Sequence, residues 1–225
     1  MNRRSMFVLC STIAIGAGCF RRGTLPPMEV YQLIRPVPSS AADPASSGNR
    51  TASTIAVAPF EAPGIYGDQS IVFRLDSGET RRYGAYTTRE WGVPLGEMVG
   101  AIVASRLAAD VGEQRVVYDP PSRRGHTYLL RGTIREFEEV NRGLDVFAAV
   151  RLDGTLVRSA DDSVVWRGTA AVERPAGRTR VMAEVVAALS AAAQDAAMIL
   201  STGTASVLQG QSNIAPAAAA PARRP

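Results

Sequence analysis

The stretch TYLLRGTIREFEEVNRGLDVFAAVRLDGTLVRSADDSVVWRGTAAVERP, residues 127–175, decides the fold. Apolar and polar residues alternate along most of it, as they do in half-buried β-strands. The alternation divides the stretch into three segments, residues 127–140, 144–159 and 163–175. The links between the segments are only a few residues long, so each can form a tight turn. The stretch therefore predicts an antiparallel meander of three long strands.

One face of this meander is predicted to be buried, because apolar side chains recur at every second position. On the middle strand the residues of this face are Val146, Ala148, Val150 and Leu152. On the last strand they are Val164, Trp166, Gly168, Ala170 and Val172. Such a face needs a covering layer.

Two amphipathic helices are expected to provide that layer. The earlier helix follows Pro94, a residue suited to a first helical turn, and its apolar residues are three and four positions apart. Gly92, Gly96 and Gly100 recur at intervals of four, which we interpret as close packing of the helix on the sheet rather than as a membrane contact. The later helix is expected over residues 178–202, with Gly203 as its stop.

Shorter strands are expected upstream. They are predicted at residues 28–36, 54–60, 70–76, 80–86 and 115–118, and Gly78 supplies the turn of a hairpin between the third and the fourth. The order of strands, helix, strands and helix predicts a two-layer α/β sandwich, with a mainly antiparallel sheet and two helices packed on one face.

A single α/β domain is expected over residues 28–203, with an internal loop at residues 36–53 that is rich in Pro, Ser and Ala. The Ala- and Pro-rich residues 204–225 are expected to form a disordered tail.

The first 18 residues read as an export signal, because Arg3 and Arg4 precede an apolar run that is too short to span a bilayer. The run ends in small residues followed by Cys19, which favours a lipoprotein signal peptide at residues 1–18 and acylation of Cys19. Residues 19–27 would then be an acylated tether. Simple secretion after the small residues is the alternative.

Charge and composition exclude several classes of function. Removal of residues 1–18 takes away Arg3 and Arg4 and no acidic residue, so the net charge falls from +4 to +2. This value does not indicate a nucleic-acid partner. The single histidine, His126, is interpreted as a strand-edge residue, and there is no Cys/His metal spacing and no phosphate-binding loop. We therefore expect no catalytic, cofactor-binding or metal-ligating residues.

Three aromatic residues are candidates for contact with a partner protein: Trp91, Tyr66 and Tyr86. Trp and Tyr are enriched at protein interfaces, where a large apolar ring and a polar atom are both used. For Trp91 the alternative is that the indole anchors the start of the first helix in the core, and we prefer this interpretation.

The order of motifs resembles that of the ABC-type transport auxiliary lipoproteins, the PqiC-like group. The motifs are Cys19 after its signal, Tyr31–Leu33, Ile55–Pro59, residues 63–74, residues 86–95, residues 128–137 and the Ala-rich last helix. The resemblance covers residues 19–202, and only Cys19 corresponds to a defined chemical site of the family. It implies a non-enzymatic lipoprotein without cofactors, held by its acyl chains on the periplasmic face of the outer membrane. It also implies a partner, an MCE-domain protein of a lipid transport system.

Two functions are carried forward from the sequence. The first is an accessory lipoprotein of such a transport or envelope-maintenance system. The alternative is an outer-membrane assembly or structural lipoprotein that binds lipopolysaccharide machinery or peptidoglycan. Self-association into a homo-oligomer is compatible with both.

Overall fold

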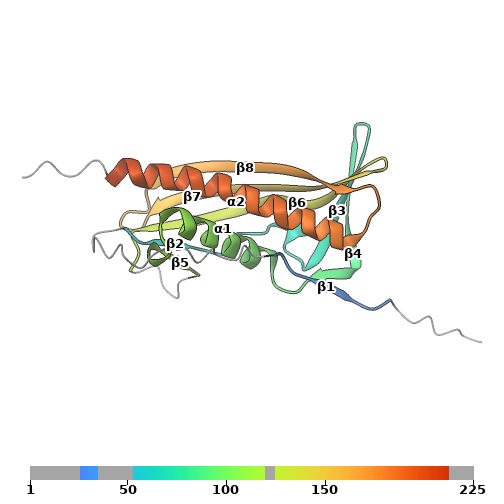
Figure 1. Cartoon of the computed structure of the whole chain (residues 1–225), viewed down its shortest axis with the longest axis horizontal. Coiled ribbons are helices and arrows are strands. Elements are labelled where there is room, and N and C mark those ends of the chain that lie inside the picture. Colours follow the sequence, from blue (N-terminus) through green and yellow to red (C-terminus); the bar gives the residue numbers. More distant parts are fainter. Residues whose placement is uncertain (1–25, 35–52, 120–124, 213–225) are drawn as a thin grey trace, which may run out of the picture.

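The computed structural model describes residues 26–34, 53–119 and 125–212. Cys19 and its signal lie outside the described residues, as do most of the expected tether and internal loop. The described residues form one large sheet with two helices along it (Figure 1).

The sheet has eight strands. They are β1 (Glu29–Tyr31), β2 (Ile55–Val57), β3 (Ser70–Ser77), β4 (Thr80–Trp91), β5 (Val116–Tyr118), β6 (Tyr128–Arg142), β7 (Asp145–Arg158) and β8 (Val164–Gly177). Two 3-10 turns, η1 (Gly64–Tyr66) and η2 (Glu113–Arg115), connect some of them. The helices are α1 (Leu95–Val111) and α2 (Met182–Ser212).

Strands β6, β7 and β8 form the expected antiparallel meander, and β3 and β4 form the expected hairpin with Gly78 in a left-handed conformation at its turn. The prediction of a mainly antiparallel sheet is wrong for the other pairings. Both β2 and β3 run parallel to β6 along one of its edges, β2 beside the first half and β3 beside the second. Strand β1 also runs parallel to its neighbour β4, and β5 runs parallel to β2, so the sheet is mixed.

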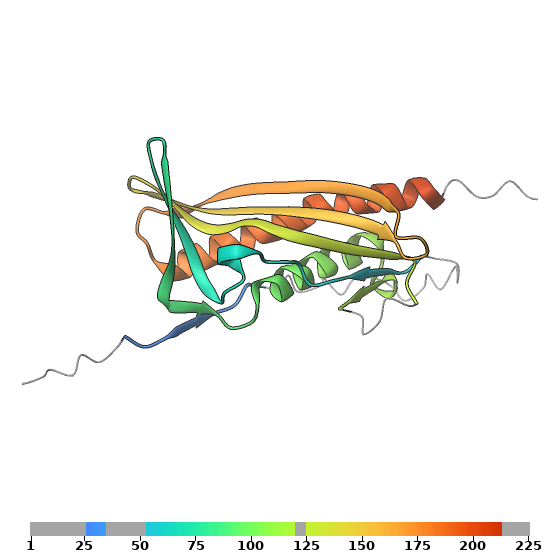
Figure 2. The same ribbon diagram turned by 180° about the vertical axis from the view of Figure 1, so that it is seen from behind.

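Both helices lie on one face of the sheet, which confirms the two-layer arrangement (Figures 1 and 2). The apolar residues of α1 that are spaced three and four positions apart are buried: Leu95, Met98, Val99, Ile102, Val103 and Leu107. The glycines of α1 allow it to approach the segment after β2. A Cβ atom on Gly96 would lie 1.9 Å from the carbonyl oxygen of Phe60, so no larger residue fits there. The interpretation as close packing of the helix is confirmed for Gly96 and Gly100, whereas Gly92 lies before α1 and packs against Val30 and Gln32.

Helix α2 is longer than expected. It continues through Gly203 to Ser212, so part of the expected tail is helical. At this point the indole of Trp166 packs against the helix, and it would lie 2.5 Å from a Cβ atom on Gly203. By length and hydropathy α2 could cross a membrane, but 61% of its apolar window is buried in this fold.

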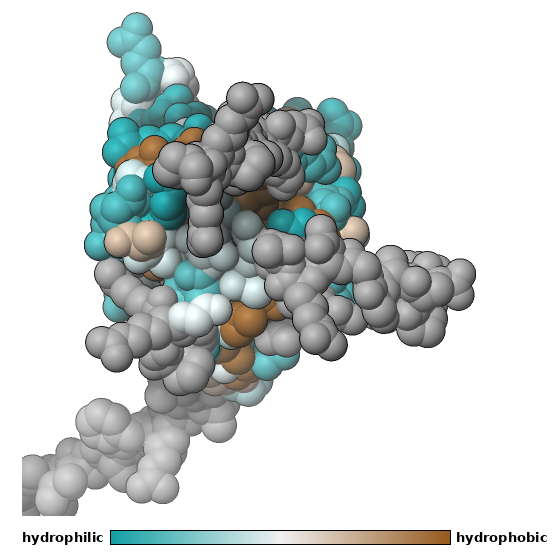
Figure 3. Space-filling model, turned by 90° about the vertical axis from the view of Figure 1, so that its left-hand side faces the viewer, coloured by the Kyte–Doolittle hydropathy of each residue, from teal (hydrophilic) through white to brown (hydrophobic). Residues whose placement is uncertain are grey.

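The two hairpin tips, between β3 and β4 and between β6 and β7, project together from the same end of the sheet (Figure 2). At the opposite end, where α2 terminates, the surface combines hydrophilic areas with smaller hydrophobic ones (Figure 3). The molecule is therefore elongated, with its two ends built from different elements.

Candidate functional site

Two polar sites lie on the sheet. The first is a buried cluster of Tyr66, Tyr86, Glu138 and Glu139, which we call the tyrosine–glutamate cluster. Glu138 and Glu139 are consecutive residues of β6 and neither side chain is exposed to solvent. Because consecutive side chains of a strand point to opposite faces, each carboxylate needs its own partners.

Glu138 is held by an arginine and a tyrosine. Its Oε1 lies 2.7 Å from Nη1 of Arg74, and its Oε2 accepts a hydrogen bond from the Tyr66 hydroxyl. Arg74 in turn lies 3.0 Å from Asp76 on the same strand. Burial raises the pKa of Glu138, against the hydrogen bond from Tyr66 and the charge of Arg74, which lower it. Burial and the contact with Glu138 also raise the pKa of Tyr66.

Glu139 has a different set of partners. The Tyr86 hydroxyl donates to its Oε2 at 2.8 Å, and the amide of Asn141 donates to its Oε1 at 2.8 Å. Arg180, just before α2, donates to Asn141 at 2.7 Å. Burial and the hydrogen bond to Glu139 raise the pKa of Tyr86 to about 12.

These contacts give the cluster a structural role. The tyrosines come from η1 and β4, so each ties another segment to β6 through a hydrogen bond to a buried charge. A buried carboxylate whose oxygens are all occupied favours the one register that supplies those partners, since any other register leaves it unpaired. The cluster therefore fixes how the β3–β4 hairpin sits on β6.

The aromatic candidates from the sequence all contact this part of β6. The ring of Trp91 packs edge-on against Phe137 at a centroid distance of 5.8 Å, while Tyr66 and Tyr86 bind the next two residues. Trp91 is 2% exposed and Tyr66 is 8% exposed, so a partner cannot reach either ring without local opening of the fold. Trp91 instead anchors the core just before α1. Tyr86 is half-buried.

The other ionisable residue singled out from the sequence, His126, lies just before β6 at the edge expected for it. Among the residues that the structure describes, no group of three or more His, Cys, Asp or Glu could hold a metal ion.

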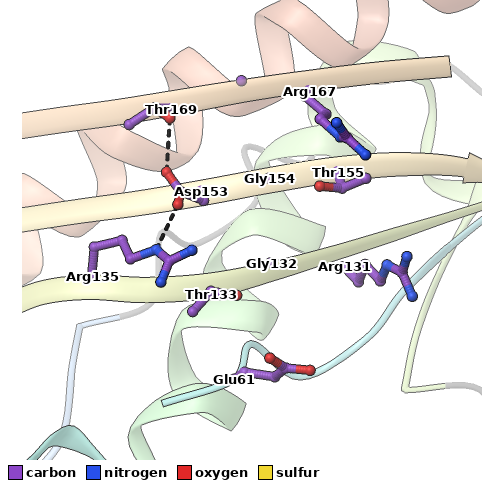
Figure 4. A pocket seen from close by; sticks show the side chains of 11 residues that line it. Glu61, Arg131, Gly132, Thr133, Arg135, Asp153, Gly154, Thr155, Arg167 and Thr169 are labelled. Carbon is purple, nitrogen blue, oxygen red and sulfur yellow. Dashed lines mark hydrogen bonds and ion pairs between the residues drawn. The ribbon is translucent and has the colours of Figure 1, made fainter. Parts of the chain in front are cut away.

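The second site is a trough on the face of the sheet that the helices leave open (Figure 4). Its volume is about 700 Å³. Three tripeptides form most of it, one on each of β6, β7 and β8: Arg131-Gly132-Thr133, Asp153-Gly154-Thr155 and Arg167-Gly168-Thr169. We call it the Gly-Thr trough.

The strand register places these tripeptides side by side. Gly132, Gly154 and Gly168 form one row across the three strands, with Cβ directions toward Phe60, Trp166 and Leu200 on the helix side. The residues on either side of each glycine therefore point to the open face. One of the two resulting rows is Arg131, Thr155 and Arg167, and the other is Thr133, Asp153 and Thr169.

The trough was not expected from the sequence, although its signal is present there. A Gly-Thr pair preceded by a charged residue occurs once in each strand of the meander. The pairs can be recognised as one site only from the strand register, which places residues 12 to 24 positions apart side by side in one row.

Comparison with known proteins identifies a family and solved structures with a similar fold. Residues 31–199 match the model of a family described as ABC-type transport auxiliary lipoprotein component. The crystal structure of a Xanthomonas campestris protein of the family DUF330 aligns with a TM-score of 0.66 and 24% identity, covering 82% of this chain and 98% of that one. A second crystal structure, of an uncharacterized protein, aligns with a TM-score of 0.59 and 13% identity over 79% of this chain and 98% of that one. No curated protein matches the chain significantly.

Proposed function

Because the chain belongs to the family of ABC-type transport auxiliary lipoprotein components, we propose that it is a membrane-anchored, non-enzymatic accessory subunit of a lipid transport system. Its partner would be the MCE-domain protein of that system, met at the periplasmic face of the outer membrane. The observation that carries this proposal is the family match, which spans almost all of the described domain.

Anchoring through Cys19 sets how far the domain can be from the membrane. Glu29, the first residue of β1, lies ten positions after Cys19. A fully extended chain covers at most about 3.3–3.6 Å per residue, so the tether reaches roughly 35 Å. Two or three acyl chains hold a protein on a bilayer without a spanning helix, whereas one chain binds only marginally. The domain would therefore work close to the membrane surface.

The chemistry of the tyrosine–glutamate cluster supports a non-enzymatic role. A general acid or base must have a face free for a substrate. Glu138 and Glu139 are fully buried, and both oxygens of each are bound to other side chains. The packing of β3 and β4 on β6 accounts for the burial of both glutamates and for the raised pKa of Glu138.

The proposal is tested by site-specific photocrosslinking in native envelopes. A crosslinking amino acid at Tyr83, exposed on the β3–β4 hairpin, reports one end of the molecule, and one at Val117, exposed on β5, serves as a probe elsewhere on the surface. Crosslinks to an MCE-domain protein that are lost in Cys19→Ala are the expected result. Crosslinks only to lipopolysaccharide-assembly or peptidoglycan-associated proteins would overturn it in favour of the alternative function. The mass of the purified protein in detergent decides whether it forms a homo-oligomer.

A further inference from the structure

We propose that the Gly-Thr trough binds a phosphate-type oxyanion between Arg131 and Arg167. This inference concerns the open face of β6, β7 and β8 and does not depend on the partner proposed above. The ligand would be a phosphate mono- or diester, either a soluble compound or the headgroup of an anionic lipid.

The first observation is that two arginines share one row. The register pairs Arg131 with Thr155 and Thr155 with Arg167, so the two arginines flank a threonine on neighbouring strands. Adjacent strands are about 4.8 Å apart, which separates the two arginine Cα atoms by about 10 Å. An anion above Thr155 is within reach of both guanidinium groups and of one hydroxyl between them.

The second observation is that these two guanidinium groups have no partner within the described part of the chain, where neither makes a hydrogen bond or an ion pair (Figure 4). Their neighbour Arg135 differs, since it donates to Asp153 at 2.6 Å. Asp153 also accepts from Thr169 at 2.7 Å. Burial raises the pKa of Asp153, but the hydrogen bonds from Arg135 and Thr169 outweigh burial and lower it. Asp153 is therefore ionised, and its negative charge is already compensated by Arg135.

The shape of the site follows from the lengths of its side chains. Glycine and threonine occupy much of the floor, while the long arginines rise at its sides. Glu61 lies at one rim, where its backbone bonds to β6, and is the remaining acidic residue of the lining. Because Arg135 and Asp153 compensate each other, the two unpaired arginines and Glu61 give the lining of the trough a net positive charge. Arginine suits phosphate because its planar fork donates two parallel hydrogen bonds to two oxygens.

The experiment uses the full chain purified in a neutral detergent, with binding measured by isothermal titration calorimetry. The probes are sodium phosphate, glycerol 1-phosphate, and detergent micelles doped with phosphatidylglycerol or with phosphatidylcholine. The test variant is Arg131→Gln with Arg167→Gln. The matched control is Arg82→Gln together with Arg81→Gln, which removes the same charge from the exposed β3–β4 hairpin.

We expect the test variant to lose at least tenfold in affinity, because two charge-assisted hydrogen-bonding groups are removed. The control should bind like the natural chain, and binding should weaken as salt is added. Binding of phosphate or glycerol 1-phosphate identifies a soluble ligand, whereas binding only to phosphatidylglycerol micelles identifies a lipid headgroup. Equal affinity of the test and control variants, or binding of no probe, would overturn the proposal. Since neither arginine has a partner to lose, thermal unfolding of the test variant should match that of the natural chain.

Discussion

Tyr66 donates its phenolic hydrogen bond to Glu138, a carboxylate that is completely buried in the second half of β6, the longest strand. The tyrosine belongs to η1, the short turn between β2 and β3, and both of those strands pair in parallel with β6. This bond therefore ties the segment between the two parallel pairings to β6, beside the backbone hydrogen bonds that Glu61 makes with Gly132 and Ile134.

Tyr66→Phe should destabilise the domain, because it removes a donor from a buried charge without changing the ring. The free energy of unfolding is expected to fall by about 1–3 kcal/mol, the cost of leaving such a group short of a partner. Urea denaturation followed by circular dichroism measures it. Tyr31→Phe is the control, since Tyr31 also donates to a glutamate, at 2.8 Å, but at the exposed edge strand β1. A loss of equal size in the control would contradict the special role of burial.

The free energy of unfolding should fall at alkaline pH, and part of this fall should come from the ionisation of Tyr86. Its pKa is about 12 in the folded chain against 10.0 for the ordinary side chain, so above pH 10 the unfolded state loses this proton first. The contribution is present below pH 10 and is lost as the pH rises toward 12. The free energy of unfolding of the natural chain should therefore drop more steeply between pH 10 and 12 than that of Tyr86→Phe. Identical slopes would show that the hydroxyl does not titrate with folding.

The sequence predicted the elements whose signals are local. The β3–β4 hairpin, the meander and the inner face of α1 follow from alternation, turn residues and helical spacing within short windows. The parallel pairing of β3 with β6 joins Val72 to Glu138, residues with no common local pattern. For that reason the mixed character of the sheet could not be predicted.

The buried glutamates show the same limit. Glu138 and Glu139 are consecutive charged residues of a strand, and nothing in their local sequence indicates that both are buried. They are buried because Arg74, Tyr66 and Tyr86 reach them from β3, η1 and β4. Asn141 binds Glu139 from within the same strand. The sequence singles out Tyr66 and Tyr86, but the glutamates that they bind can be recognised only once the tertiary structure is known.

Gly96→Ala should be strongly destabilising, although alanine favours helices over glycine by about 1 kcal/mol. The added methyl group would meet the carbonyl oxygen of Phe60, whose amide donates to the Gly96 carbonyl at 2.9 Å. The carbonyl oxygen of Phe60 belongs to the backbone and cannot rotate away as a side chain could, so α1 would have to shift. We expect the free energy of unfolding to fall by about 2–3 kcal/mol. Ser105→Ala, a substitution in the same helix at a half-buried position, should change stability by less than about 0.5 kcal/mol. Thermal unfolding measures the stability of both variants, and equal losses in the two would contradict the steric clash at Gly96.

Gly203 and Trp166 should be energetically coupled, because the glycine leaves the space that the indole fills. A Cβ atom at residue 203 would lie 2.5 Å from the indole, and Gly168 on β8 makes room for the same ring with a corresponding distance of 2.3 Å. Gly203→Ala is therefore expected to destabilise the natural chain by about 1–3 kcal/mol through overpacking. In a Trp166→Leu background the ring is gone, and the same substitution should be neutral or stabilising through helix propensity. A double-mutant cycle measures the difference, which should exceed about 1 kcal/mol for residues in direct contact. Additive effects would mean that α2 passes Gly203 for a reason other than its packing on Trp166.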